Sequence, residues 1–217
     1  MLVYRTVRLA TKSIDSEAIL RFWFDDAVHQ PESIQRAKQR WYRGGAALDR
    51  LIAAQFKAMH ASAAAREKGD GLTDREILAR IILLDQFSRH LYRGTPKAFA
   101  FDPLALTFSR QLDDAKTVVD LHPVEQLFTL HPYHHSENRS AQHIGISKLE
   151  ALTQQVPSCW LPLFQGFLKS FQAHALIIER FGRFPHRNDI LNRANSPQET
   201  EYLKQQPQRY GQSHGHH

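Results

Sequence analysis

The 217-residue chain contains 42% apolar and 23% charged residues, one cysteine, and a formal net charge of +6 at pH 7. This composition is typical of a globular domain with a sizeable core, and the single cysteine excludes an internal disulfide and favours a reducing, cytoplasmic compartment. No apolar run approaches the ~18 residues of a transmembrane helix, so the sequence predicts no membrane span.

Helical periodicity runs through almost the whole chain, and capping residues, prolines and glycines divide it into segments. The TDRE sequence at 73–76 and the SPQE sequence at 196–199 are capping boxes. Gly69 and Gly182 are expected to end helices, and Ser136 to begin one. The predicted helices, in chain order, are 15–24, a short segment from Pro31, 46–69, 73–92, segments from Asp102 and from Pro123, 136–154, 157–182 and a segment from Ser196.

These segments predict an all-α protein of eight or nine helices with short connections, and we find no convincing strand. We expect an N-terminal arm at 1–14, a single helical domain at 15–205, and a flexible His-containing tail at 206–217. Basic residues are spread along the chain without a recognisable binding module, which disfavours nucleic acid as a partner.

The first polar motif is LLDQFSRHLYRG at 83–94. Asp85 precedes Arg89 by four residues, which places both on one face of a strongly apolar helix. Two interpretations stay open: a structural ion pair that joins helices, or an acid that orients Arg89 toward a ligand. Arg93 lies in the last turn, where a cation complements the helix dipole.

The second motif is HPYHHSENRSAQH at 131–143. His134, His135 and Glu137 are expected at a loop-to-helix junction, where helix N-terminal N–H groups favour anions. Imidazoles and a carboxylate are also zinc ligands, but the spacing matches no zinc motif, so we expect no metal and no cofactor.

The third motif is ERFGRFPHRND at 179–189. Gly182 and Pro185 should break the helix, which places Arg183 and Arg187 on a connection. Arginine forks bind carboxylate and phosphate in a bidentate way. We therefore expect these two arginines to face a bound anion and Arg180 to be structural.

The stretches LDQFSRH, YRGTPKAFAFD, PYHHSE and IIERFGRFPHRNDIL together resemble the bacterial family called domain of unknown function 924, from about Ile19 to Leu203. The resemblance implies an α-helical array similar to a tetratricopeptide-like superhelix and carries no established activity. The chain departs from the family where Ser88 and His90 replace a proline and an asparagine. The family's recurrent positions carry over to Asp85, Gln86, Arg89, Arg93, His135, Ser136, Glu137, Gln142, Arg180, Gly182, Arg183, His186, Arg187 and Asn188.

The leading functional hypothesis is a pocket between helices that binds an anionic small molecule, a carboxylate or a phosphorylated metabolite. Its predicted binding residues are Arg89, Arg93, His135, Arg183, His186, Arg187 and Asn188. A second hypothesis is a hydrolase in which His135 with Glu137, or His186 with Asp85, supplies acid–base chemistry to a water. A third is a peptide-binding helical scaffold. The sequence leaves open whether the protein is an enzyme.

Overall fold

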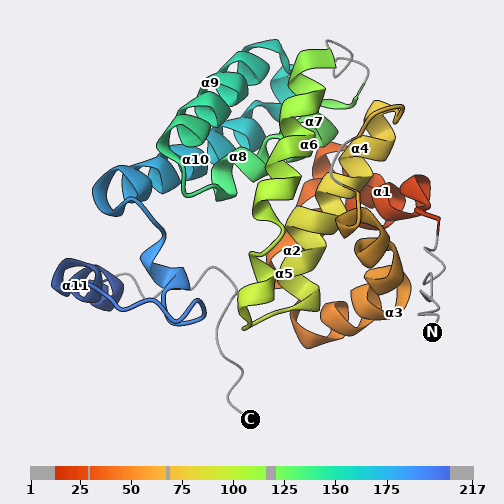
Figure 1. The fold of residues 1–217 in the computed structure, drawn as a ribbon. Coiled ribbons are helices and arrows are strands. Elements are labelled where there is room, and N and C mark those ends of the chain that lie inside the picture. The colour runs from red at the N-terminus through yellow and green to blue at the C-terminus, as the bar shows by residue number, and fades with distance from the viewer. Residues whose placement is uncertain (1–12, 29, 67–68, 116–120, 206–217) are drawn as a thin grey trace, which may run out of the picture.

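The computed structural model describes residues 13–28, 30–66, 69–115 and 121–205, and within these ranges the chain is helical without a strand (Figure 1). Nine helices of seven or more residues occur there: α1 (Ser16–Phe24), α2 (Ile34–Arg43), α3 (Gly45–Ala64), α4 (Asp74–Ile81), α6 (Asp102–Ala115), α7 (Pro123–Thr129), α9 (Arg139–Gln155), α10 (Leu161–Phe181) and α11 (Pro197–Gln205). Two shorter helices are α5 (Ser88–Leu91) and α8 (His131–His135). The all-α prediction is confirmed.

Some parts of the prediction are not tested. Residues 1–12 of the predicted arm and the whole predicted tail at 206–217 lie outside the described residues. The single domain at 15–205 and the tetratricopeptide-like arrangement remain predictions. No helix in the described part of the chain is long and apolar enough to cross a membrane.

Most predicted helix ends are found at the expected caps. The Thr73 side chain and Glu76 form the capping box that begins α4, and Ser196 and Glu199 form the equivalent pair at α11. Gly182 ends α10 with a φ of 70°, a conformation that glycine adopts without a steric cost.

Two predicted helix ends are wrong. Asn138, not Ser136, caps α9, because residues 131–135 form their own short helix and the chain must turn before α9 begins. The long helix from residue 46 ends at Ala64, and the left-handed glycine in the following loop is Gly71, not Gly69.

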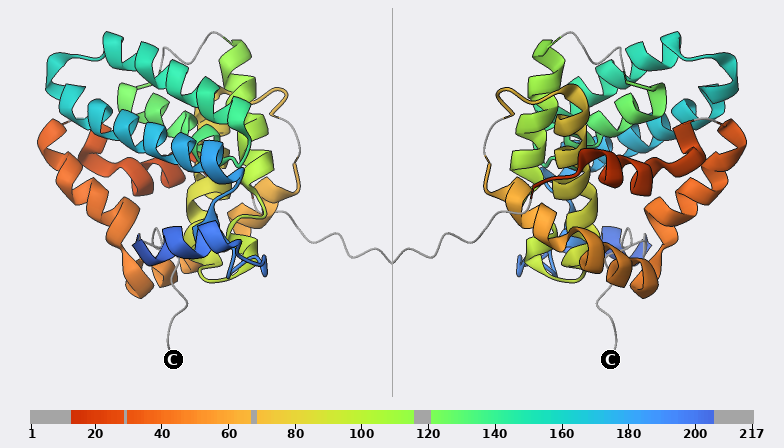
Figure 2. Two further views of the ribbon diagram at one scale, coloured as in Figure 1. Left: turned by 90° about the vertical axis from the view of Figure 1, so that its left-hand side faces the viewer. Right: turned by 90° about the vertical axis from the view of Figure 1, so that its right-hand side faces the viewer.

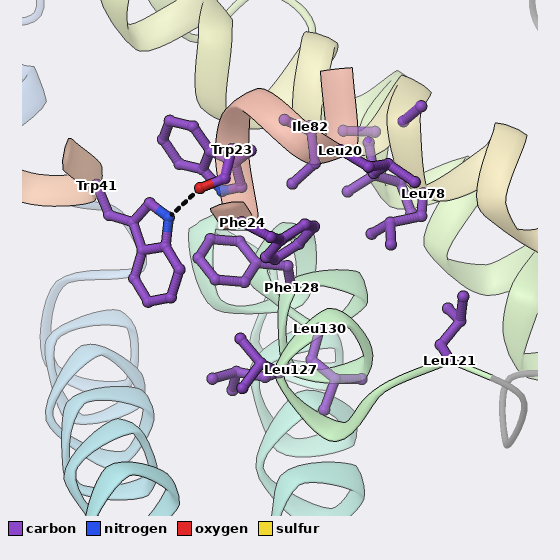
Figure 3. Packing of buried hydrophobic residues seen from close by; sticks show 14 of the residues in the cluster. Leu20, Trp23, Phe24, Trp41, Leu78, Ile82, Leu121, Leu127, Phe128 and Leu130 are labelled. Carbon is purple, nitrogen blue, oxygen red and sulfur yellow. Dashed lines mark hydrogen bonds between the residues drawn. The ribbon is translucent and has the colours of Figure 1, made fainter. Parts of the chain in front are cut away.

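An aromatic cluster packs the N-terminal helices onto α7. Trp41 donates its indole N–H to the carbonyl of Trp23 at 3.0 Å, and the Phe128 ring lies 4.7 Å from the ring of Trp41 and 5.2 Å from that of Phe24 (Figure 3). Burial of each such side chain contributes about 1.5–3 kcal/mol. This cluster fixes α2, which supplies one wall of the site.

A π-helical segment, Ile82–Phe87, joins α4 to α5 so that residues 74–91 form one continuous helix. All six π-helical residues are buried, including Asp85 and Gln86. Ser88 occupies one of the two positions where the chain departs from the family pattern. Its hydroxyl donates to the Leu84 carbonyl and forms a hydrogen bond of 2.8 Å with Nε2 of His60. Short π-helical segments within α-helices frequently occur at functional sites.

The helices form two groups on either side of α6. In Figure 1, α9 and α10 run side by side at the upper left, next to α8, while α1, α3 and α4 lie on the right. The side views of Figure 2 show the chain after α10 descending as a loop toward α11. That loop includes the turn Pro185–Arg187, which closes the site described next.

Candidate functional site

A cavity of about 860 Å³ lies between the α2–α3 junction, Gln86 of the π-helical segment, α5, α8, α10 and the turn at 185–187. Its basic lining residues are Lys38, Arg43, Arg89, Arg93 and Arg187. Its histidines are His90, His131, His134, His135, His174 and His186. Within the described residues, Asp49 is the one acid on its wall. Aromatic and aliphatic surface comes from Trp41, Tyr42, Phe99, Leu163 and Phe167.

Five of the predicted binding residues line this cavity, and the three polar motifs meet there. The five are Arg89, Arg93, His135, His186 and Arg187. Arg183 and Asn188 do not line it, and neither do Glu137 and Asp85.

Arg89 and Arg187 share one carboxylate. Asp102, the first residue of α6, lies 2.8 Å from Nη1 of Arg89 and 3.3 Å from Nη1 of Arg187. The Phe99 ring lies 4.7 Å and 4.6 Å from these two guanidiniums. Arg89 also donates to the carbonyl of Ala98. Two mostly buried cations are thus clamped between one acid and one aromatic face.

The charge states of these arginines follow from this arrangement. Burial lowers the pKa of Arg187 to about 10, because the negative charge of Asp102 offsets only part of that effect and the positive charge of Arg89 lowers the pKa further. Burial also lowers the pKa of Arg89, but Asp102 and Asp85 more than compensate, so its pKa is raised. Both side chains are therefore charged at neutral pH.

Asp85 is wholly buried behind His135. Its Oδ1 lies 2.7 Å from Nδ1 of His135, and the Gln86 amide donates to its Oδ2. Burial raises the pKa of Asp85, but the charge and hydrogen bond of His135, together with Arg89, lower it further than burial raises it. The carboxylate is thus ionised and orients the His135 ring.

The third motif is tied to the second through the backbone. Nη2 of Arg187 donates to the carbonyl of His135 at 3.0 Å. The Phe184 ring lies 4.5 Å from the Arg187 guanidinium on the same turn. This contact holds the end of α8 against the turn and fixes the position of His135.

The inner histidines are buried and neutral. Burial, with the field of nearby cations, lowers the pKa of His131 to about 4, of His174 to about 3 and of His186 to about 2, and lowers that of His134 well below its ordinary value. The rings of His134 and His174 are 3.9 Å apart, a distance that two imidazolium ions would not tolerate. Nδ1 of His134 has no hydrogen-bond partner among the described residues.

A second acid–base group stands at another part of the wall. Asp49 lies 2.7 Å from Nδ1 of His90 and accepts two hydrogen bonds from Arg93, at 2.7 and 2.8 Å. Burial raises the pKa of Asp49, but these bonds outweigh it and lower the pKa to about 2. His90, the second departure from the family pattern, thus pairs with an acid of α3.

Sequence reasoning missed Asp49, Asp102, Lys38 and Arg43 as parts of the site. Asp102 was expected only at the start of a helical segment, and Asp49 lies in the predicted helix 46–69 without any motif around it. Lys38 and Arg43 occur in a strongly basic amphipathic helix, IQRAKQRWYR, which is equally typical of a solvated surface.

The predicted acid–base pairs need correction. His135 pairs with Asp85, not with Glu137, because Glu137 accepts two hydrogen bonds from Arg193 and one from the backbone N–H of Phe184. In the described part of the chain, Asp85, the acid that the hypothesis assigned to His186, accepts hydrogen bonds from His135 and Gln86.

Arg183, Asn188 and Arg180 stabilise the C-terminal segment. Arg183 makes a bidentate pair with buried Glu199 of α11, both bonds at 2.7 Å, and Asn188 is buried against residues 193 and 195. The Arg180 guanidinium lies 4.8 Å from the Phe181 ring and 5.9 Å from that of Tyr202. Arg183 and Asn188 are therefore not part of the candidate site.

No group of three or more His, Cys, Asp and Glu side chains in the described ranges is arranged to hold a metal ion. Guanidiniums, imidazoles and the Gln86 amide supply hydrogen-bond donors to the cavity, between the aromatic and aliphatic parts of its wall.

A family model for bacterial proteins of unknown function (DUF924) matches residues 19–207. The chain is also similar to a solved structure, the protein of unknown function ATU0120 from Agrobacterium tumefaciens, at 31% identity and a TM-score of 0.69. That likeness covers 88% of this chain and 97% of the other. No curated protein matches. The chain therefore belongs to the DUF924 family of bacterial proteins.

Proposed function

We propose that this protein binds an anionic small molecule, a carboxylate or a phosphorylated metabolite, in the cavity around Arg89 and Arg187. One observation carries the proposal: five Arg or Lys side chains and six histidines line a cavity on whose described wall Asp49 is the one acid. The single cysteine, Cys159, favours the reducing cytoplasm as the place of this binding.

The charge balance around the cavity supports an anion. Asp102 and Asp85, which lie near the wall, and Asp49 on it supply three negative charges against five positive ones. Neither Lys38 nor Arg43 pairs with an acid in the described part of the chain. Lys38 is half-buried and Arg43 is exposed, so both cations are available to a ligand, and an anion that binds only the folded protein would lower the free energy of the folded state.

The size and walls of the cavity suit a small molecule rather than a peptide. A volume of about 860 Å³ falls within the ~300–1,000 Å³ of ordinary ligand pockets. Trp41, Phe99 and Phe167 offer apolar surface for the uncharged part of a metabolite. A peptide-binding scaffold would require an extended concave groove, so the cavity favours the small-molecule interpretation.

Thermal melting with and without inorganic phosphate or malonate tests the proposal. An anion at 100 times its Kd stabilises the protein by about 2.7 kcal/mol. Arg187→Lys keeps the charge beside Asp102 but loses the planar fork and its contacts with the His135 carbonyl and the aromatic rings, so we expect a lower melting temperature and also a much smaller anion-induced rise.

Arg183→Lys is the matched control, because Arg183 belongs to the same segment and forms a bidentate ion pair outside the cavity. It should lower the melting temperature while keeping the full anion-induced rise. The proposal is refuted if phosphate and malonate both fail to raise the melting temperature of the wild type. It is also refuted if the two variants show the same anion-induced rise.

A further inference from the structure

We propose that His135 is a general base that removes a proton from the molecule bound at Arg89 and Arg187, with Asp85 as its positioning residue. This inference rests on the proposed function and adds a reaction to it. It makes the protein a catalyst of proton transfer on an anionic substrate.

The fold itself fixes the Asp85 carboxylate. It is 0% exposed, whereas the His135 side chain is 19% exposed and lines the cavity. The Gln86 amide holds the second carboxylate oxygen, and both residues belong to the buried π-helical segment. An ordinary ion pair would not require this irregular helix, which commonly marks functional positions.

The hydrogen bond determines which ring nitrogen is free. An ionised carboxylate only accepts, so Nδ1 of His135 must carry the proton that it donates to Asp85 across 2.7 Å. In the neutral ring, Nε2 then holds a lone pair on the opposite edge, away from the buried acid. No hydrogen bond to Nε2 occurs among the described residues, and His135 lines the cavity.

Among the three histidines of α8, His135 is the one that is not buried. His131 and His134 are its neighbours on α8, with ring centroids at 5.9 and 5.2 Å, and both are buried. Arg187 donates to the His135 carbonyl, and Arg89 lies one helical turn beyond Asp85. The base and two cations thus come from three different segments.

The step moves one proton. A substrate X–H bond breaks, its electron pair stays on the substrate atom, and a new N–H bond forms at Nε2. Asp85 balances the positive charge of the resulting imidazolium, and Arg89 and Arg187 stabilise the negative charge that develops on the substrate. The same proton returns to the product in the reverse transfer. A positioned base of this kind contributes about 10²–10⁴-fold in rate.

Long-range ¹H–¹⁵N NMR correlation spectra of the histidine rings test this directly, with His135→Gln assigning the resonances. We expect neutral His135 to be protonated at Nδ1 and bare at Nε2, and we expect added inorganic phosphate to shift the Nε2 resonance. Asp85→Asn offers an amide N–H to Nδ1, so it should move the ring proton to Nε2. The wild-type spectrum by itself shows which ring nitrogen of His135 is protonated, so the test does not depend on whether Asp85→Asn folds.

His143 is the internal control. It pairs with Glu179 through Nε2 at 2.8 Å on the exposed face of α9, so it should show the opposite tautomer and no response to phosphate. Phosphate that stabilises the protein while His135 stays protonated at Nε2, or stays unshifted, overturns this inference alone. A protein that neither phosphate nor malonate stabilises refutes the proposed function and, with it, this inference.

Discussion

Replacing Asp102 by asparagine removes the carboxylate that Arg89 and Arg187 share without changing the shape of the side chain. The acid lies 2.8 Å from one guanidinium and 3.3 Å from the other, and the side chains of the three residues are only 12%, 15% and 7% exposed. Removing one partner of a buried ion pair costs about 3–5 kcal/mol, because the remaining charge stays buried. Such a loss is a large fraction of the ~5–15 kcal/mol that stabilises a typical domain.

Urea denaturation followed by tryptophan fluorescence measures this loss. Asp25→Asn is the matched control, because Asp25 pairs with Arg40 at 3.0 Å but its side chain is 58% exposed. Exposed pairs contribute about 0–1 kcal/mol. We also expect phosphate to stabilise Asp102→Asn more than the wild type, since no carboxylate then competes for the two arginines. A loss below 1 kcal/mol would show that water, not Asp102, compensates the arginines.

Three further predictions concern stability. Burial chiefly lowers the pKa values of His60 and His131 to about 4 and that of His174 to about 3. The neutral rings therefore contribute fully to the free energy of unfolding above pH ~6.5, and this contribution falls by about 1.4 kcal/mol per pH unit and per histidine as the pH decreases toward 4. A urea midpoint unchanged between pH 7 and 5 would contradict this. Gly145→Ala should cost about 1–3 kcal/mol, since its Cβ would lie 2.7 Å from Cβ of Tyr133. Gly166→Ala, with nothing within 4 Å, should raise stability by about 0.5–1 kcal/mol, and calorimetry compares the two variants.

Local chemistry explains why the helices were predictable. Capping boxes such as Thr73 with Glu76 depend on residues three apart, and apolar stripes depend on neighbours within two turns. All the residues that form a capping box or an apolar stripe are therefore close together in the sequence and can be recognised from it. A helix start was predicted wrongly where two possible capping residues, Ser136 and Asn138, lie close together in the sequence. Because residues 131–135 form a short helix, Asn138 is the residue that caps α9.

The membership of the site depended on residues far apart in the sequence. Arg183 and Arg187 lie four positions apart on one connection and look alike in the sequence. Arg183 meets Glu199, sixteen residues away, while Arg187 meets Asp102, eighty-five residues away. Motif and spacing cannot separate them, because the distinction depends on which acid each one reaches after folding. The π-helical segment that presents Asp85 has no sequence signature either.

The state of Arg187 links the electrostatics of the cavity to its proposed role. A guanidinium normally has a pKa well above 12, yet burial and Arg89 hold that of Arg187 at about 10 even with Asp102 beside it. Its charged form is therefore short of negative partners, and its Nε has no hydrogen bond among the described residues. An anion bound in the cavity would supply the missing negative charge. The neutral histidines around it matter for the same reason, because each of them adds donors and acceptors to the wall without adding a further buried cation that the anion would have to offset.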